Sequence, residues 1–160
     1  MREAVIVSTA RTPIGKAYRG SFNNTHAQTL AGHAISEAVK RAKVDPTDID
    51  DVILGAAAQQ GTQQGNIARQ SLLRAGLPTS VAGMSIDRQC ASGMMAIATA
   101  AKQIIDDGMN ITVGGGVESV SLVRNENFRM DNARDPWLEN EMPELYMTMI
   151  ETAETVADRY

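Results

Sequence analysis

Short apolar runs alternate along this chain with longer segments in which apolar residues recur every three to four positions. The apolar runs predict buried strands at residues 4–8, 52–56, 82–87 and 111–113. The periodic segments predict helices at residues 26–42, 67–75 and 90–106. An alternation of this kind is typical of a mostly parallel sheet with helices on both faces, so the sequence predicts an α/β fold.

Local signals refine this outline. Thr25 stands three residues before Gln28, which is the spacing of a capping box at the start of the first helix. After the predicted strand at 111–113, the sequence becomes polar and loses its periodicity over residues 119–144, as in an insertion or a lid. Helical spacing returns at Met149 and continues to the last residue. We therefore divide the chain into an α/β domain at 1–118 and a separate segment at 119–160.

Composition excludes several classes of function. The chain has 160 residues, enough for one domain, and its 15 basic and 19 acidic side chains give a net charge of -4. This balance offers no basic surface for nucleic acid, and no apolar run reaches the roughly 18 residues that span a bilayer. The first residues lack the cleavage site of a secretory signal. The single cysteine suits a reducing compartment. We expect a cytoplasmic protein that binds neither nucleic acid nor membrane.

That cysteine, Cys90, is the candidate nucleophile. A predicted strand ends near Asp87 and a helix is predicted to begin at about Cys90, where the positive end of the helix dipole stabilises a thiolate. The first backbone N–H groups of a helix lack helical partners, so they can also hold an oxyanion. Small residues at 91–93 leave room for a substrate. Because free cysteines are among the most buried residues, a packed structural thiol is an open alternative.

The residues around Cys90 carry a resemblance to a known family. The run Asp-Arg-Gln-Cys-Ala-Ser-Gly at 87–93 resembles the nucleophile motif of thiolases. Further segments resemble the same family in the same order, namely residues 10–15, 52–55, 65–70, 114–119 and 152–157. The resemblance therefore covers nearly the whole chain.

The resemblance implies a thiolase-like fold built from two βαβαβαββ halves. This chain would supply the N-terminal half without all of its strands, and residues 119–160 would begin the inserted loop domain. It implies an acyltransferase that cleaves 3-ketoacyl-CoA with coenzyme A, or condenses two acyl-CoA molecules, in fatty acid metabolism. Cys90 would carry the acyl group and its backbone N–H would hold the oxyanion. Met149 would border the acyl pocket, although Ile150 stands where family members often have glycine. Acyl-CoA would be a substrate, with no permanently bound cofactor, and the protein would be a homodimer or homotetramer.

Two catalytic groups of the family lie outside this sequence. Thiolases use a histidine in a Gly-His-Pro motif and a second cysteine, both in the C-terminal half, and neither motif occurs here. His26 and His33 are predicted at surface or capping positions, and two histidines alone do not make a metal site, so no metal is expected. We therefore expect an N-terminal fragment that is inactive alone and needs the C-terminal half as its partner. An incomplete sheet should leave an apolar edge or face exposed.

Alternative interpretations remain open at this point. The chain could be a non-catalytic assembly fragment in which Cys90 is buried, or part of a ketosynthase-like condensing enzyme. Residues 114–116 are three glycines that match neither a dinucleotide fingerprint nor a P-loop. They are predicted to let a strand and a helix pack closely. The glutamine-rich stretch at 59–64 is predicted to be a loop at an oligomer interface.

Overall fold

The computed structural model describes residues 2–160, which form two compact units. One unit ends at Phe128 and the other runs from Arg129 to Tyr160. The predicted boundary at residue 118 falls ten residues before the end of the first unit.

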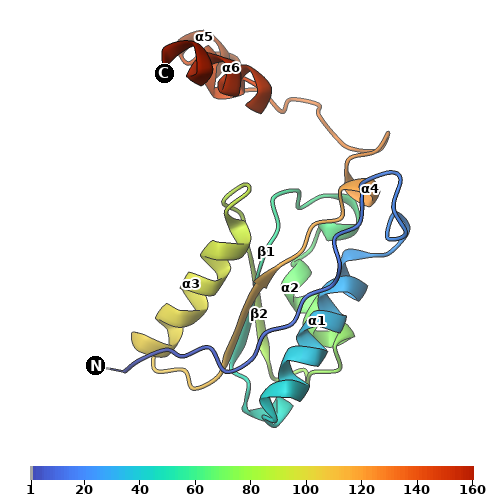
Figure 1. The fold of residues 1–160 in the computed structure, drawn as a ribbon, viewed down its shortest axis with the longest axis vertical. Coiled ribbons are helices and arrows are strands. Elements are labelled where there is room, and N and C mark those ends of the chain that lie inside the picture. The colour runs from blue at the N-terminus through green and yellow to red at the C-terminus, as the bar shows by residue number, and fades with distance from the viewer. Residues whose placement is uncertain (1) are drawn as a thin grey trace. The chain divides into compact units, whose positions relative to one another are not determined.

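A three-stranded parallel sheet forms the centre of the first unit (Figure 1). Strands β1 (Asp51–Gly55), β2 (Ala82–Ile86) and β3 (Thr112–Gly116) lie in the order β2-β1-β3. Helices α1 (Ala27–Ala42) and α2 (Ile67–Arg74) cover one face, and α3 (Ser92–Ile105) covers the other. Short 3-10 turns at Pro46–Asp48 and Gly61–Gln63 connect these elements. The predicted α/β fold with helices on both faces is confirmed.

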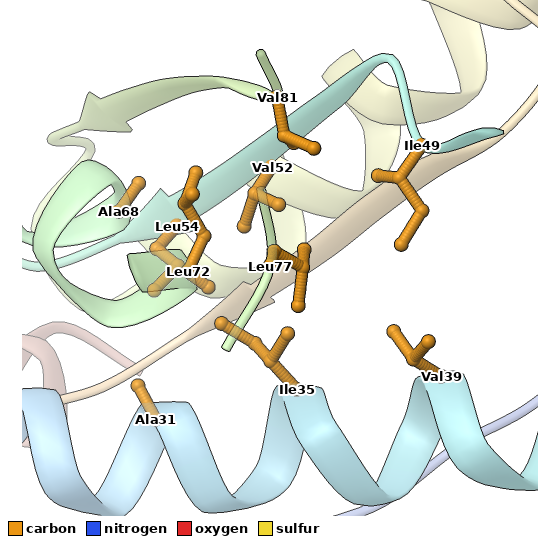
Figure 2. Packing of buried hydrophobic residues seen from close by; sticks show 10 residues of the cluster. All are labelled: Ala31, Ile35, Val39, Ile49, Val52, Leu54, Ala68, Leu72, Leu77 and Val81. Atoms are coloured by element: carbon orange, nitrogen blue, oxygen red, sulfur yellow. The ribbon is translucent and has the colours of Figure 1, made fainter. Parts of the chain in front are cut away.

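Strand β1 is buried along its whole length because helices cover both of its faces. Successive side chains of a strand point to opposite faces. Val52 and Leu54 accordingly join the cluster between the sheet and α1 and α2, where Ile35 and Leu72 also lie (Figure 2). Ile53 packs on the other face against Ala96 and Ala100 of α3.

The predicted first strand at residues 4–8 is wrong. These residues form no strand, and Val5, Ile6 and Val7 are 70%, 78% and 71% exposed. An apolar run becomes a strand only when a neighbouring strand bonds its backbone, and the three-stranded sheet does not include this segment. The residue that follows this segment, Thr9, is instead bonded by a side chain: Arg41 donates a hydrogen bond to its carbonyl oxygen at 2.9 Å.

The predicted capping box at the start of α1 is also wrong. His26 is the N-cap residue and no side chain caps the helix. The Gln28 side chain points into the fold, where its Nε2 donates to the carbonyl oxygen of Thr62 and to Oε1 of Gln70, both at 2.6 Å. This tertiary contact takes the place of the local one.

Two of the apolar side chains of α3 point to solvent, since Met94 and Ile97 are 77% and 48% exposed. The buried face of α3 contains small residues instead. A Cβ on Gly114 of β3 would lie 2.8 Å from Cα of Ile97 and 3.1 Å from Cβ of Ala100. The close strand–helix packing predicted for the glycines is confirmed, and it admits only small side chains between the two backbones.

After β3, the predicted irregular stretch contains only short helices: α4 (Val120–Val123) in the first unit, and α5 (Pro136–Glu141) and a 3-10 turn at Pro143–Tyr146 in the second. The helical spacing near the end corresponds to α6 (Met149–Arg159). Thr148 caps α6 in a capping box with Glu151, which the sequence analysis did not single out. Across residues 2–160, none of the helices has the length and apolar character needed to cross a membrane.

Candidate active site

The candidate nucleophile lies at the edge of the sheet where the carboxyl ends of the parallel strands meet. In α/β sheets this edge is where ligands usually bind. Strand β2 ends at Ile86, a turn follows, and α3 begins at Ser92, so Cys90 stands two residues before the helix. The prediction that the helix begins at Cys90 is therefore wrong by two residues. Cys90 is exposed, which does not fit the alternative of a buried structural thiol.

Hydrogen bonds within the turn explain why the helix does not start earlier. Gln89 adopts a left-handed backbone conformation with φ of 49°, and its N–H donates to Oδ1 of Asp87 at 2.7 Å. The hydroxyl of Ser92, a residue only 4% exposed, accepts from the Arg88 N–H at 2.8 Å and donates to the carbonyl oxygen of Gln89 at 2.6 Å. These bonds close a tight turn and present Cys90 to solvent. Arg88 itself is exposed.

The start of α3 lies directly against the ends of two strands. A Cβ on Gly55, the last residue of β1, would lie 2.2 Å from the carbonyl carbon of Ser92 and 2.5 Å from the backbone nitrogen of Gly93. A Cβ on Gly116, the last residue of β3, would lie 3.0 Å from Cα of Gly93. Gly55 therefore has no room for a Cβ, whereas one at Gly116 would require a small shift of Gly93, and the two strand ends fix where the helix begins.

The backbone N–H groups at the start of α3 follow Cys90 directly in the chain. The first bonds of α3 run from the Ser92 N–H to the carbonyl oxygen of Gln89 at 3.1 Å and from the Met95 N–H to the carbonyl oxygen of Ala91 at 2.9 Å. A helix start leaves its remaining N–H groups for solvent or an anion. An oxyanion formed next to Cys90 would therefore lie close to the positive end of α3.

A second polar cluster at this edge was missed by the sequence analysis. Gln63 is completely buried, and its Nε2 donates to the carbonyl oxygen of Ala58 at 2.8 Å and to Oε1 of Glu118. The other carboxylate oxygen of Glu118 accepts from the Ala57 N–H at 2.9 Å. Gln63 thus has an internal role, whereas Gln59 and Gln64 of the same stretch are exposed, and the oligomer interface expected there stays a prediction. No local pattern could have revealed the pair, because its members are 55 residues apart.

The other predicted site residues are placed as follows. Met149 is the first residue of α6, 73% exposed, and belongs to the second unit, whereas Cys90 belongs to the first. His26 and His33 are exposed, as predicted. Within residues 2–160, no group of three or more His, Cys, Asp or Glu side chains is arranged to hold a metal ion.

The fold and the site define an α/β protein with an exposed cysteine on a strand-to-helix turn at the carboxyl edge of its sheet. The family model described as "Thiolase, N-terminal domain" matches residues 4–160, and the chain therefore belongs to the thiolase family.

Individual relatives agree with this assignment. The chain is 40% identical to the 3-ketoacyl-CoA thiolase of Bacillus subtilis over 162 aligned residues, covering 100% of the chain and 40% of the relative. It is 44% identical to the 3-oxoadipyl-CoA/3-oxo-5,6-dehydrosuberyl-CoA thiolase of Escherichia coli, covering 76% of the chain and 30% of the relative. The crystal structure of the Bacillus anthracis acetyl-CoA acetyltransferase is similar to it with a TM-score of 0.71 at 44% identity, covering 76% of the chain and 30% of that protein. The chain thus spans 30% to 40% of the length of these relatives.

Proposed function

We propose that this chain is the N-terminal part of an acyltransferase of the thiolase type, in which Cys90 carries the acyl group. The observation that supports the proposal most is the position of Cys90, exposed on a hydrogen-bonded turn two residues before α3. Sulfur at this position is accessible to a substrate and lies near backbone donors. Relatives named 3-ketoacyl-CoA thiolase and acetyl-CoA acetyltransferase support the choice of acyl-CoA as the substrate class.

The proposed reaction begins with attack of the Cys90 thiolate on a carbonyl carbon. With 3-ketoacyl-CoA, Sγ attacks the 3-keto carbon, the bond between C2 and C3 breaks, and the departing carbanion takes up a proton to give acetyl-CoA, while the rest of the acyl chain stays on Cys90 as a thioester. Coenzyme A then loses its thiol proton, attacks the thioester on Cys90 and leaves with the acyl group. Condensation follows the same steps in reverse. The backbone N–H of Cys90 stabilises the oxyanion that forms at each attack.

The remaining parts of the proposal concern the whole protein. The histidine and second cysteine that assist these proton transfers would come from a C-terminal half, so the chain alone would not turn over. Residues 119–160 would begin the loop domain, and the separate unit from Arg129 to Tyr160 is consistent with this. Met149 would border the acyl pocket. Coenzyme A would act as a substrate with no resident cofactor, in a cytoplasmic homodimer or homotetramer of fatty acid metabolism.

A chimeric enzyme tests this function. The segment of the E. coli acetyl-CoA acetyltransferase that aligns with this chain, at 41% identity over 122 residues, is replaced by the matching residues of this chain. We expect acetyl transfer between two acetyl-CoA molecules in the chimera and its loss on Cys90→Ser. The matched control is Ala91→Cys combined with Cys90→Ser, which moves the thiol by one position to another exposed residue and leaves the Ser92 hydroxyl in place. Activity that survives Cys90→Ser would contradict the proposal, as would a folded chimera with no activity.

A further inference from the structure

The polar cluster formed by Gln63 and Glu118 lies outside the chemistry proposed above. Gln63 is 0% exposed, although a buried side-chain amide needs partners for both of its polar ends. Its Nε2 donates to Ala58 and to Glu118, and its Oε1 accepts from the Ser119 N–H at 2.5 Å. The amide therefore has partners at both ends.

These hydrogen bonds connect the segments that follow two neighbouring strands, β1 and β3. Ala57 and Ala58 follow the end of β1, while Glu118 and Ser119 follow the end of β3. The Glu118 carboxylate accepts from the Ala57 N–H at 2.9 Å, and more weakly from the Ala58 N–H at 3.4 Å. Gln63 and Glu118 thus tie the carboxyl ends of β1 and β3 together, just beyond the sheet.

The two strand ends are also the surfaces on which α3 begins. A Cβ on Gly55 would overlap the backbone of Ser92 and Gly93, and a Cβ on Gly116 would lie only 3.0 Å from Cα of Gly93. The segment after β1 is bonded to β2 as well, since the Ala56 N–H donates to the carbonyl oxygen of Ile86 at 3.1 Å. Ile86 is the last residue before the turn that carries Cys90. A change in the spacing of the strand ends must therefore move the start of α3 or the turn.

We propose that Gln63 and Glu118 are positioning residues that hold the Cys90 turn in its reactive geometry. They act through Gly55, Gly116 and Ser92. This inference depends on the proposed function, because Gln63 and Glu118 can position a nucleophile only if Cys90 is one.

The chain contains a matched control at the opposite end of the same sheet. Gln103 of α3 donates a hydrogen bond to Oδ2 of the buried Asp51 at 2.8 Å, where β1 begins. Gln63→Met and Gln103→Met remove the same kind of amide–carboxylate bond in the same fold. Only the first lies at the edge that carries Cys90.

The experiment compares these two variants in the chimeric acetyltransferase and in the isolated chain. We expect Gln63→Met to lower kcat by roughly 10- to 100-fold, because small displacements of a reacting group have effects of this size. We expect it also to change the rate of Cys90 alkylation by iodoacetamide and the dependence of that rate on pH. Gln103→Met should lower thermal stability to a smaller extent, because the Gln103 side chain makes one hydrogen bond and that of Gln63 makes three, and should leave the alkylation profile and kcat close to those of the parent.

Glu118→Gln provides a second, milder variant if Gln63→Met does not fold, because it keeps the size and shape of the side chain. The exchange Gln63→Glu with Glu118→Gln restores a donor–acceptor pair, so the double variant should recover part of the kcat that Gln63→Glu loses. An unchanged kcat and alkylation profile in folded Gln63→Met or Glu118→Gln would overturn the inference, as would equal losses from Gln103→Met. An inactive parent chimera that also fails to acylate Cys90 would instead refute the proposed function.

Discussion

Because α3 begins so close to the strand ends, substitution of three glycines by alanine should destabilise the protein to different extents. A Cβ at Gly55 would lie 2.2 Å from the Ser92 carbonyl carbon, which is short of an ordinary carbon–carbon contact of ~3.5 Å by roughly 1.3 Å. A Cβ at Gly116 would lie 3.0 Å from Cα of Gly93, a smaller overlap. A Cβ at Gly115 would lie 3.5 Å from Cδ2 of Leu54, which is ordinary contact.

We expect Gly55→Ala to lower the free energy of unfolding by about 3 kcal/mol or more, since the overlap is with backbone that cannot rotate away. Gly116→Ala should lose about 1–3 kcal/mol. Gly115→Ala should stay within about 1 kcal/mol of the parent, because the extra methyl fits and the unfolded chain loses entropy.

Urea unfolding followed by far-ultraviolet circular dichroism measures this series. Circular dichroism is preferable to fluorescence because the only tryptophan, Trp137, belongs to the second unit. The same samples report the rate of Cys90 alkylation, which should change most for Gly55→Ala. If Gly55→Ala were as stable as Gly115→Ala, the strand ends would not set the start of α3, and the reasoning would be refuted.

Two further outcomes follow from other parts of the chain. The Thr148 backbone N–H and hydroxyl donate to Glu151, each at 2.8 Å, and hold the pKa of that carboxyl below its ordinary value of 4.5. The capping box therefore stabilises α6 above pH 4.5, and this stabilisation is lost as the pH falls through the lowered pKa. In Thr148→Ala, an NMR titration should give a Glu151 pKa that is higher than in the parent. An unchanged Glu151 pKa would contradict this. The exposed apolar side chains of Val5–Val7, Met94 and Ile97 should make the isolated chain self-associate or unfold at low denaturant, as measured by sedimentation at several concentrations. A stable monomer at every concentration would contradict this.

The sequence predicted the central elements because their patterns depend on burial alone. Val52, Ile53 and Leu54 are consecutively apolar since β1 is covered on both faces. Residues 4–8 have the same pattern, yet they form no strand. An apolar pattern indicates which residues can be buried, but it does not tell whether a neighbouring strand is present to pair with them; the chain spans 30% to 40% of the length of its relatives.

The candidate site was predictable in part. The cysteine between a strand and a helix was visible from spacing, and the resemblance to thiolases gave it a role. The exact start of α3 could not be predicted from the sequence, because it depends on the left-handed backbone of Gln89 and on hydrogen bonds made by the Ser92 hydroxyl. Gln63 and Glu118 were missed for a related reason. Their contact is made only when the ends of β1 and β3 come together in the folded sheet.

The most direct test of the central claim is peptide mapping after incubation with acetyl-CoA, performed on this chain and on the chimera with their Cys90→Ser variants. We expect an acetyl group on the peptide that contains Cys90 and no corresponding adduct in Cys90→Ser. Acylation should be faster in the chimera, where the C-terminal half is present. An unmodified Cys90 in both proteins, or an equal level of acetylation in Cys90→Ser, would contradict the assignment of Cys90 as the acyl carrier.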